Sequence, residues 1–148
     1  MRRSKPDTQT FLLDNNVFIA AIKHPTRQTD TLKLILHIIS EPRIGLVGNV
    51  FLVEEMVKYA ELLESVTAAT ILQALLAKIE IIDVSESHVR VCLNYIDTPD
   101  YSDVVHVATC LQVCCILVSN DQHFNRIRDE GIVGVWSVKK AIEILLQG

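Results

Sequence analysis

The feature that most constrains the fold of this chain is its alternation between short apolar runs and longer segments with helical periodicity. Five runs are short and continuously apolar, and we expect them to form buried strands: Thr10–Leu13, Ile44–Val47, Ile81–Val84, Ile116–Ser119 and Val133–Trp136. Strands of this kind are typical of a parallel sheet that helices cover on both sides. The sequence therefore predicts an α/β fold, a three-layer α/β/α sandwich with a central, mostly parallel sheet of about five strands.

Capping residues and prolines bound the helices that separate these runs. We expect helices from Asn15 to about Ile22, from Thr29 or Asp30 to before Pro42, from Asn49 through Leu63, from Thr67 to Ile79, from Ser85 through Ile96, from Asp100 or Ser102 to about Cys115, from Asn120 to about Asp129, and from Ser137 through Leu146. The chain shows no internal repeat and no linker, so its 148 residues are expected to form a single domain, residues 1–148.

Charge and composition narrow the class of protein. With a net charge of −4, the chain does not resemble proteins that bind nucleic acid through a strongly basic surface. No apolar run approaches the roughly 18 residues of a membrane-spanning helix, and no signal-peptide segment is evident, so we expect a cytoplasmic protein without a membrane segment. The hydrophobic content of 49% exceeds what one small core uses, which favours a homodimer.

The cysteines carry no recognisable metal motif. Cys92, Cys110, Cys114 and Cys115 lack zinc-binding spacing, and we expect them to be buried as small apolar side chains. Whether any of them form disulfides stays open.

Acidic residues follow the predicted strands. Those that lie just after a strand or in the first turns of the next helix are Asp14, Glu54, Glu55, Asp103 and Asp121. Taken singly, each is typical of a helix cap or an exposed helix face, and Asp103 could instead pair with His106 three residues on. Together they can converge, because ligands of such sheets bind beyond the carboxyl ends of the strands.

A convergent group of carboxylates suggests metal chemistry. Neighbouring carboxylates repel one another and need cations to stay ionised at neutral pH. Oxygen ligands suit Mg²⁺ or Mn²⁺, and these ions assist hydrolysis of phosphodiesters. The sequence has no G-x-S-x-G motif and no Cys–His pair in a recognisable context, so no other nucleophile suggests itself.

Four blocks of the sequence, taken in order, resemble the PIN-domain family of metal-dependent ribonucleases. The blocks are Phe11–Phe18 with Asp14 and Asn16, Leu52–Val57 with Glu55, Asp103–Ala108, and Leu117–Phe124 with Ser119 and Asp121. The resemblance runs from about Phe11 to Trp136. The first and fourth blocks are the more specific ones.

The resemblance implies an acidic pocket formed by Asp14, Glu55, Asp103 and Asp121. This pocket would bind Mg²⁺ or Mn²⁺ and hydrolyse RNA. The resemblance favours Glu55 over Glu54, because Met56 follows Glu55 where the family has a Leu-like residue, although the choice between the two glutamates stays open. Three further residues are expected to support the site: Asn16, Ser119 and Asp100.

The chain departs from the family pattern at one position beside the site. Asn15 stands where the family usually has Thr or Ser, which alters the surroundings of the first aspartate.

The resemblance also has consequences for partners. A basic rim for RNA is expected from Arg2, Arg3, Lys5, Lys23, Arg27, Arg126 and Arg128. Many prokaryotic relatives are homodimeric toxins of toxin–antitoxin pairs, so the implied partners are an RNA substrate, a second copy of the chain and an antitoxin protein.

A different class of function stays open. The chain could be a non-catalytic α/β binding or scaffold module, or a receiver-like domain, in which the acids only cap helices and bind no metal. A receiver-like domain would have an acidic pair after its first strand and a lysine after its last. In this chain Asn15 and Asn16 follow the first strand instead of an acidic pair. Trp136 ends the last strand, and Ser137 follows it in place of a lysine.

Overall fold

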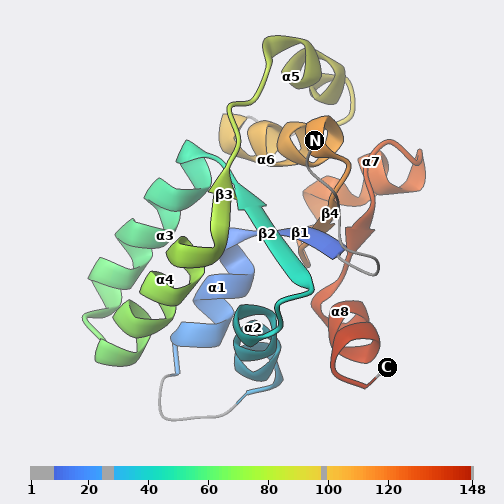
Figure 1. The fold of residues 1–148 in the computed structure, drawn as a ribbon. Coiled ribbons are helices and arrows are strands. Elements are labelled where there is room, and N and C mark those ends of the chain that lie inside the picture. Colours follow the sequence, from blue (N-terminus) through green and yellow to red (C-terminus); the bar gives the residue numbers. More distant parts are fainter. Residues whose placement is uncertain (1–8, 25–28, 98–99, 148) are drawn as a thin grey trace, which may run out of the picture.

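A computed structural model of the protein describes residues 9–24, 29–97 and 100–147 (Figure 1). Five strands form one sheet in the order β3-β2-β1-β4-β5, and each neighbouring pair is parallel. The strands are β1 (Gln9–Leu13), β2 (Ile44–Gly48), β3 (Ile79–Ile81), β4 (Ile116–Val118) and β5 (Val135–Trp136). The predicted fold class, a three-layer sandwich around a parallel sheet, is confirmed.

The described chain also has eight helices and one 3₁₀ turn, and all but the last helix connect strands. They are α1 (Asn15–Ile22), α2 (Asp30–Ser40), α3 (Val50–Leu63), α4 (Val66–Lys78), α5 (Glu86–Leu93), α6 (Tyr101–Val113), the 3₁₀ turn η1 (Gln122–Phe124), α7 (Asn125–Asp129) and α8 (Val138–Leu145). Helices α1 to α4 and α8 pack together as one layer, whereas α5 and α6 pack against each other on the opposite side (Figure 1). None of the described helices is long and apolar enough to cross a membrane.

The chain reverses its direction across the sheet at β1. From β1 it proceeds outward to β2 and β3, and it then crosses back to β4 on the other side of β1. In open parallel sheets, the crevice at which ligands bind lies beyond the carboxyl ends of the two strands at such a reversal, which are β1 and β4 here. Asp14 directly follows β1, and Ser119 directly follows β4, so the sequence places polar residues at this crevice.

The central strands are apolar because both of their faces are covered. Phe11, Leu12 and Leu13 of β1 are all at most 2% exposed, as are Leu117 and Val118 of β4. A strand with two buried faces shows a continuous apolar run instead of an alternating one, which is why these runs were predictable from the sequence.

Two predicted strands lie elsewhere than expected. The third strand is Ile79–Ile81, not Ile81–Val84, because α4 passes directly into it: Ile79 is both the C-cap of α4 and the first residue of β3. The fifth strand pairs only over Val135 and Trp136, although Val133 is buried. Beyond β3, the N–H of Ile82 still donates to the carbonyl of Gly48 at 2.9 Å, and Ile82 and Val84 pack against the core although neither belongs to the strand.

Three predicted helix ends also differ: the helix expected through Ile96 ends at Leu93, the one expected from Asn120 to Asp129 divides into η1 and α7, and the third difference involves a cysteine. The sixth helix ends at Val113, because Cys114 takes a left-handed conformation with φ of 57°. Cys114 is exposed, so the expectation that all cysteines are buried is wrong there. Cys92, Cys110 and Cys115 are buried as expected, and all four thiols are free.

Candidate active site

Asp14 lies at the crevice between β1 and β4 and is nearly inaccessible to solvent. Its backbone N–H donates to the carbonyl of Val118 at 3.0 Å, which extends the sheet by one residue beyond β1. The side chain is 5% exposed, and its Oδ2 accepts a hydrogen bond of 2.7 Å from Oγ of Ser119. Asp14 precedes α1 but makes no side-chain cap bond to it. Its carboxylate is therefore held for some purpose other than capping.

The surroundings of Asp14 disfavour its negative charge. Burial raises the pKa of this carboxyl above its ordinary value, and the hydrogen bond from Ser119 opposes that shift only in part. The nearby carboxylates of Asp121 and Glu55 raise the pKa further. Three of the candidate acids thus lie close enough to sense one another.

Asp103, Asp121 and His123 form the exposed end of the same cluster. Nδ1 of His123 lies 3.3 Å from Oδ2 of Asp103 and 3.3 Å from Oδ1 of Asp121. Burial, followed by the charge of Asp100, raises the pKa of Asp103 to about 6; the hydrogen bond to His123 lowers it, and Asp14 and Asp121 raise it. Four carboxylates therefore converge at one edge of the sheet.

Glu55 enters the cluster from α3 and is held by a histidine of α6. Nε2 of His106 lies 3.1 Å from Oε1 of Glu55. His106 is 1% exposed, and its other ring nitrogen, Nδ1, lies 3.1 Å from Nδ2 of Asn49. Asn49 follows β2 directly, and its Nδ2 also donates to Oγ1 of Thr109 at 3.0 Å. A buried chain of hydrogen bonds therefore links β2, α3 and α6 behind Glu55.

This chain of bonds assigns the protonation of His106. Oδ1 of Asn49 accepts from the backbone N–H of Leu52 at 2.9 Å, so the amide nitrogen must face His106. Nδ1 of His106 is then an acceptor, and the ring hydrogen lies on Nε2, which donates to Glu55. His106 thus fixes one oxygen of Glu55 through a neutral imidazole.

The structure distinguishes the two glutamates that the sequence left open. Glu54 is exposed on α3, whereas Glu55 points toward His106 and lies near Asp14. The alternative pairing of Asp103 with His106 does not occur: His106 contacts Glu55, and Asp103 contacts His123.

The predicted supporting residues have mixed positions. Ser119 bonds Asp14, and it also accepts the backbone N–H of Asp121 at 3.0 Å. Asp100 caps α6 by accepting from the backbone of Ser102 at 3.0 Å, and it lies near Asp103. Asn16 is exposed, and none of the contacts described for the cluster involves it. Its neighbour Asn15 is buried, and its Oδ1 has no hydrogen-bond partner among the described residues.

Sequence reasoning missed four residues that shape this region. Asn49 was expected only as a cap of α3, His106 only as an alternative partner of Asp103, and His123 only as part of a motif block, while Thr109 was given no role. A signal existed for His106, because an isolated histidine inside the apolar run Val104–Ala108 needs a buried partner. The identity of that partner depends on how α3 packs against α6.

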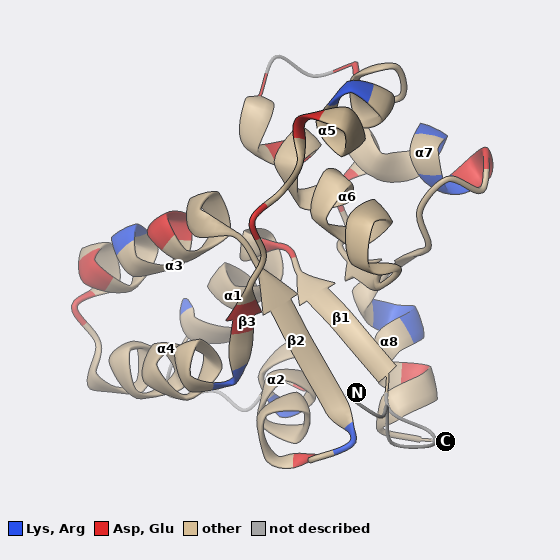
Figure 2. Ribbon diagram, turned by 45° about the horizontal axis from the view of Figure 1, so that its top comes forward, with Lys and Arg blue, Asp and Glu red and all other residues tan. Residues whose placement is uncertain are grey.

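Three residues of the predicted basic rim lie in the described part of the chain: Lys23, Arg126 and Arg128. Arg126 pairs with Asp97 and Glu130, and Arg128 pairs with Asp129, so both of these cations are already neutralised. Lys23 is exposed. The other predicted rim residues, Arg2, Arg3, Lys5 and Arg27, lie outside the described residues. Figure 2 shows Lys and Arg dispersed over several helices, next to acidic segments on α3 and α7.

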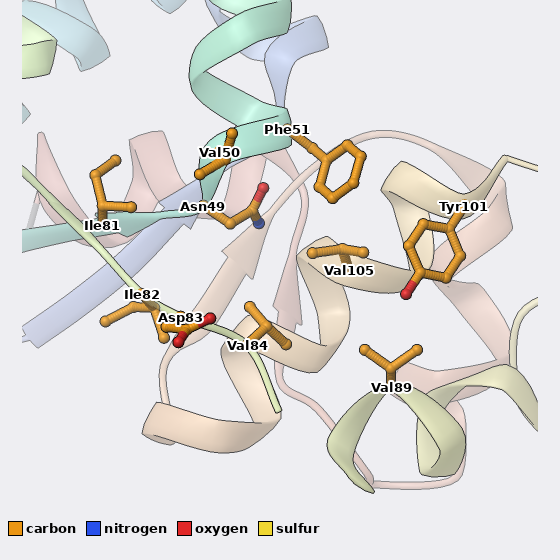
Figure 3. A pocket seen from close by; sticks show the side chains of 10 residues that line it. All are labelled: Asn49, Val50, Phe51, Ile81, Ile82, Asp83, Val84, Val89, Tyr101 and Val105. Atoms are coloured by element: carbon orange, nitrogen blue, oxygen red, sulfur yellow. The ribbon is translucent and has the colours of Figure 1, made fainter. Parts of the chain in front are cut away.

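A cavity of about 340 Å³ borders the buried network behind Glu55. Asn49 and Val105 line it. Phe51 and Tyr101 lie at one side of it, and their rings meet edge to face with the ring centroids 5.9 Å apart (Figure 3). The lining is mostly apolar. The four candidate acids are not among its lining residues, so the carboxylate cluster and this cavity are separate features of the described surface.

The cluster has donors that suit a divalent cation. One ligand atom from each of Asp103, Asp121 and His123 lies within 4.8 Å of the others, so a single ion can reach all three. Burial is the main cause of the raised pKa values of Asp14 and Asp103, and neighbouring carboxylates add to it, so a cation would favour the ionised form of both groups. The donor set therefore fits a metal ion.

Comparison with known proteins identifies the family. The PIN domain family matches residues 11–130, which include all four converging acids. The chain belongs to the PIN domain family. PIN domains are generally metal-dependent nucleases, which agrees with the acidic cluster. No curated protein matches the sequence significantly.

Solved structures with this fold have low sequence identity to the chain. VapBC-1 from nontypeable Haemophilus influenzae superposes with a TM-score of 0.63 at 18% identity, covering 89% of this chain and 100% of that one. VapBC2 from Rickettsia felis, bound to a DNA fragment from its promoter, gives 0.62 at 16% identity, covering 87% and 98%. PAE2754 from Pyrobaculum aerophilum gives 0.57 at 16% identity, covering 95% and 98%. At such identities the likeness establishes the fold.

Proposed function

We propose that this PIN domain is a ribonuclease that hydrolyses phosphodiester bonds of single-stranded RNA with the help of Mg²⁺ or Mn²⁺. The observation that carries the proposal is a convergence of four acids where the chain reverses its direction across the sheet, between β1 and β4. These acids are Asp14, Glu55, Asp103 and Asp121. Carboxylates that lie at the carboxyl ends of parallel strands, two of them with pKa values raised by burial and by neighbouring acids, are a site suited to positive charge.

Three aspartates are assigned to the cation and one glutamate to the water. Asp14, Asp103 and Asp121 would hold the ion, which when bound supplies an activated water and neutralises charge on the phosphodiester. Glu55 either adds a further ligand or accepts a proton from the attacking water. His106 fixes Oε1 of Glu55 and leaves the other oxygen for this task.

The supporting residues orient these carboxylates. Ser119 donates to Asp14 and accepts from the backbone of Asp121, so one hydroxyl links the acids that follow β1 and β4. Such partners of metal-binding carboxylates raise affinity by fixing their direction. Asp100 lies near Asp103 and adds to the negative potential that attracts a cation.

A non-catalytic role for the acids has one observation in its favour. Asp121 accepts the backbone N–H of His123 at 2.9 Å, and Asp100 caps α6, so two of the acids do act as caps. Asp14 caps nothing, and Glu55 lies inside α3 on a buried histidine. A scaffold role does not explain why the carboxylates of Asp14 and Glu55 lie close to each other.

The proposal extends to partners. VapBC proteins are toxin–antitoxin pairs with this fold, and we extend their assembly to this chain as a toxin that an antitoxin protein silences. Exposed apolar side chains, such as Leu62 at 67% and Val66 at 84%, support a homodimer or an antitoxin contact. A cytoplasmic location is consistent with cellular RNA as the substrate.

The decisive test uses two isosteric substitutions. Asp14→Asn and Asp121→Asn keep the shape of the side chain and its ability to accept a hydrogen bond but remove its charge. We expect both variants to lose Mn²⁺-dependent cleavage of single-stranded RNA, as the wild type does in EDTA, while their melting curves stay intact. Asp129→Asn, which removes an exposed acid of α7, is the matched control and keeps full activity. If Asp14→Asn and Asp121→Asn cleave RNA at the wild-type rate, the acids are structural and the proposal is wrong.

A further inference from the structure

His123 stands where an additional ligand of the same cation would stand. Its Nδ1 lies 3.3 Å from an oxygen of Asp103 and 3.3 Å from an oxygen of Asp121. Neighbouring ligands of an octahedral ion with bonds of about 2.1 Å lie about 3 Å apart. The separations at His123 are therefore those of adjacent ligands on one ion.

The position of His123 is fixed by the backbone around it. Its own N–H donates to Oδ1 of Asp121 at 2.9 Å, and the N–H of Asp121 donates to Ser119 at 3.0 Å. The next residue, Phe124, is fully buried and anchors the turn η1 in the core. The imidazole itself is 54% exposed, so an ion can enter from solvent.

The ring can coordinate a metal only through the nitrogen that faces the carboxylates. A neutral imidazole with its hydrogen on Nε2 presents a lone pair at Nδ1, and this nitrogen is the one that lies against Asp103 and Asp121.

We propose that His123 is a nitrogen ligand of the bound ion and that it makes the site prefer Mn²⁺ over Mg²⁺. Imidazole suits transition metals, whereas Mg²⁺ binds almost entirely through oxygen. The all-carboxylate set inferred from the sequence gives no such preference. This inference rests on the proposed metal site, and it adds a ligand that the four sequence blocks did not assign.

Electron spin echo spectroscopy of the full chain loaded with Mn²⁺ tests the ligand directly. In the wild type, we expect the Mn²⁺ spin echo to be modulated by a ¹⁴N nucleus that is bound directly to the ion. This modulation should be lost in His123→Asn, which offers an amide in place of the ring. Two control variants keep the modulation: His24→Asn changes an exposed histidine just beyond α1, and His106→Gln removes the imidazole at Glu55.

Metal affinities provide the second readout. His123→Asn should weaken Mn²⁺ binding by at least about tenfold, the lower end of what losing a partner of a metal ligand costs, and should change Mg²⁺ binding less. Bound Mn²⁺ without ¹⁴N modulation, or modulation that persists in His123→Asn, would overturn the role of His123 and leave the nuclease proposal standing. If the wild type binds no Mn²⁺ and EDTA does not affect RNA cleavage, the metal site itself is wrong.

Discussion

The two sides of the acidic cluster are built differently. On the anchored side, Glu55 is tied through His106 to Asn49 and Thr109, and this chain is buried from end to end behind the carboxylate. On the open side, Asp103 and Asp121 contact His123, whose ring is more than half exposed. Glu55 is therefore fixed by a buried network before any ligand arrives, whereas the side-chain contact that joins Asp103 and Asp121 is to an exposed ring.

The difference indicates which task each side performs. A group that orients a water must point correctly at all times, and a rigid network of neutral hydrogen bonds achieves this without adding charge. Groups that bind a cation can stay crowded and partly protonated until the cation arrives, at a cost in stability. The three predictions below test this division, beginning with the largest expected effect.

The anchored side predicts that the two adjacent glutamates of α3 differ sharply. Glu55→Gln should lower kcat/KM for single-stranded RNA by roughly 10²–10⁴-fold, the range for a positioned acid–base group. Glu54→Gln, on the exposed face, should change it by less than about twofold. Cleavage rates in Mn²⁺, measured with both variants at equal folded concentration, check this. Equal losses in the two variants would contradict the assignment of Glu55.

The network behind Glu55 predicts a smaller, rescuable effect. His106→Leu removes the donor to Glu55 and should lower RNA cleavage roughly 10–100-fold, as loss of an orienting partner does. It also leaves the amide of Asn49 without one acceptor, which should cost about 1–3 kcal/mol of stability.

His106→Gln serves as the matched variant for this network. Its amide nitrogen reaches about as far as Nε2, so it should restore most of the cleavage. Kinetics and thermal melts of both variants separate the two roles: if His106→Gln is as inactive as His106→Leu while equally well folded, the imidazole does more than orient Glu55.

The open and anchored sides also differ in how far the sequence could predict them. Asp14 and Asp121 were predictable because each follows an apolar strand, and parallel strands bring their carboxyl ends to one edge. Asp103 was predictable as a first-turn residue of its helix. The contact between His106 and Glu55 spans 51 residues and depends on the packing of α3 on α6, which periodicity does not determine.

The fold shows the same division between local and distant information. Strands β1, β2 and β4 were predicted to within about one residue because both of their faces are buried. Strand β3 was misplaced toward Val84 because it lies at the edge of the sheet, where Ile81 is 49% exposed and burial does not mark the paired residues. Its register, Gly48 opposite Ile81, is set by the partner strand and not by its own sequence.

The smallest expected effect concerns the stability of the open side in the absence of metal. The pKa of Asp103 is about 6 in the folded protein, against an ordinary value of 3.8, mainly because the carboxyl is buried and faces Asp100, Asp14 and Asp121. The folded state therefore binds this proton more tightly than the unfolded chain does. Ionised Asp103 destabilises the fold above pH 6, and this destabilisation disappears as the pH falls below about 4.

Asp103→Asn should accordingly stabilise the metal-free protein at pH 7 by about 1–2 kcal/mol, because the amide carries no charge for burial and the neighbouring carboxylates to disfavour. The gain should shrink as the pH is lowered through 6 and vanish below the ordinary pKa of 3.8, where the wild-type carboxyl is protonated in both states. Urea unfolding of both proteins at several pH values in EDTA measures it, and added Mn²⁺ should reverse the order because only the wild type keeps the full ligand set. If Asp103→Asn is less stable at pH 7 in EDTA, the carboxylate supports the fold, and the open side is not held ready for a cation.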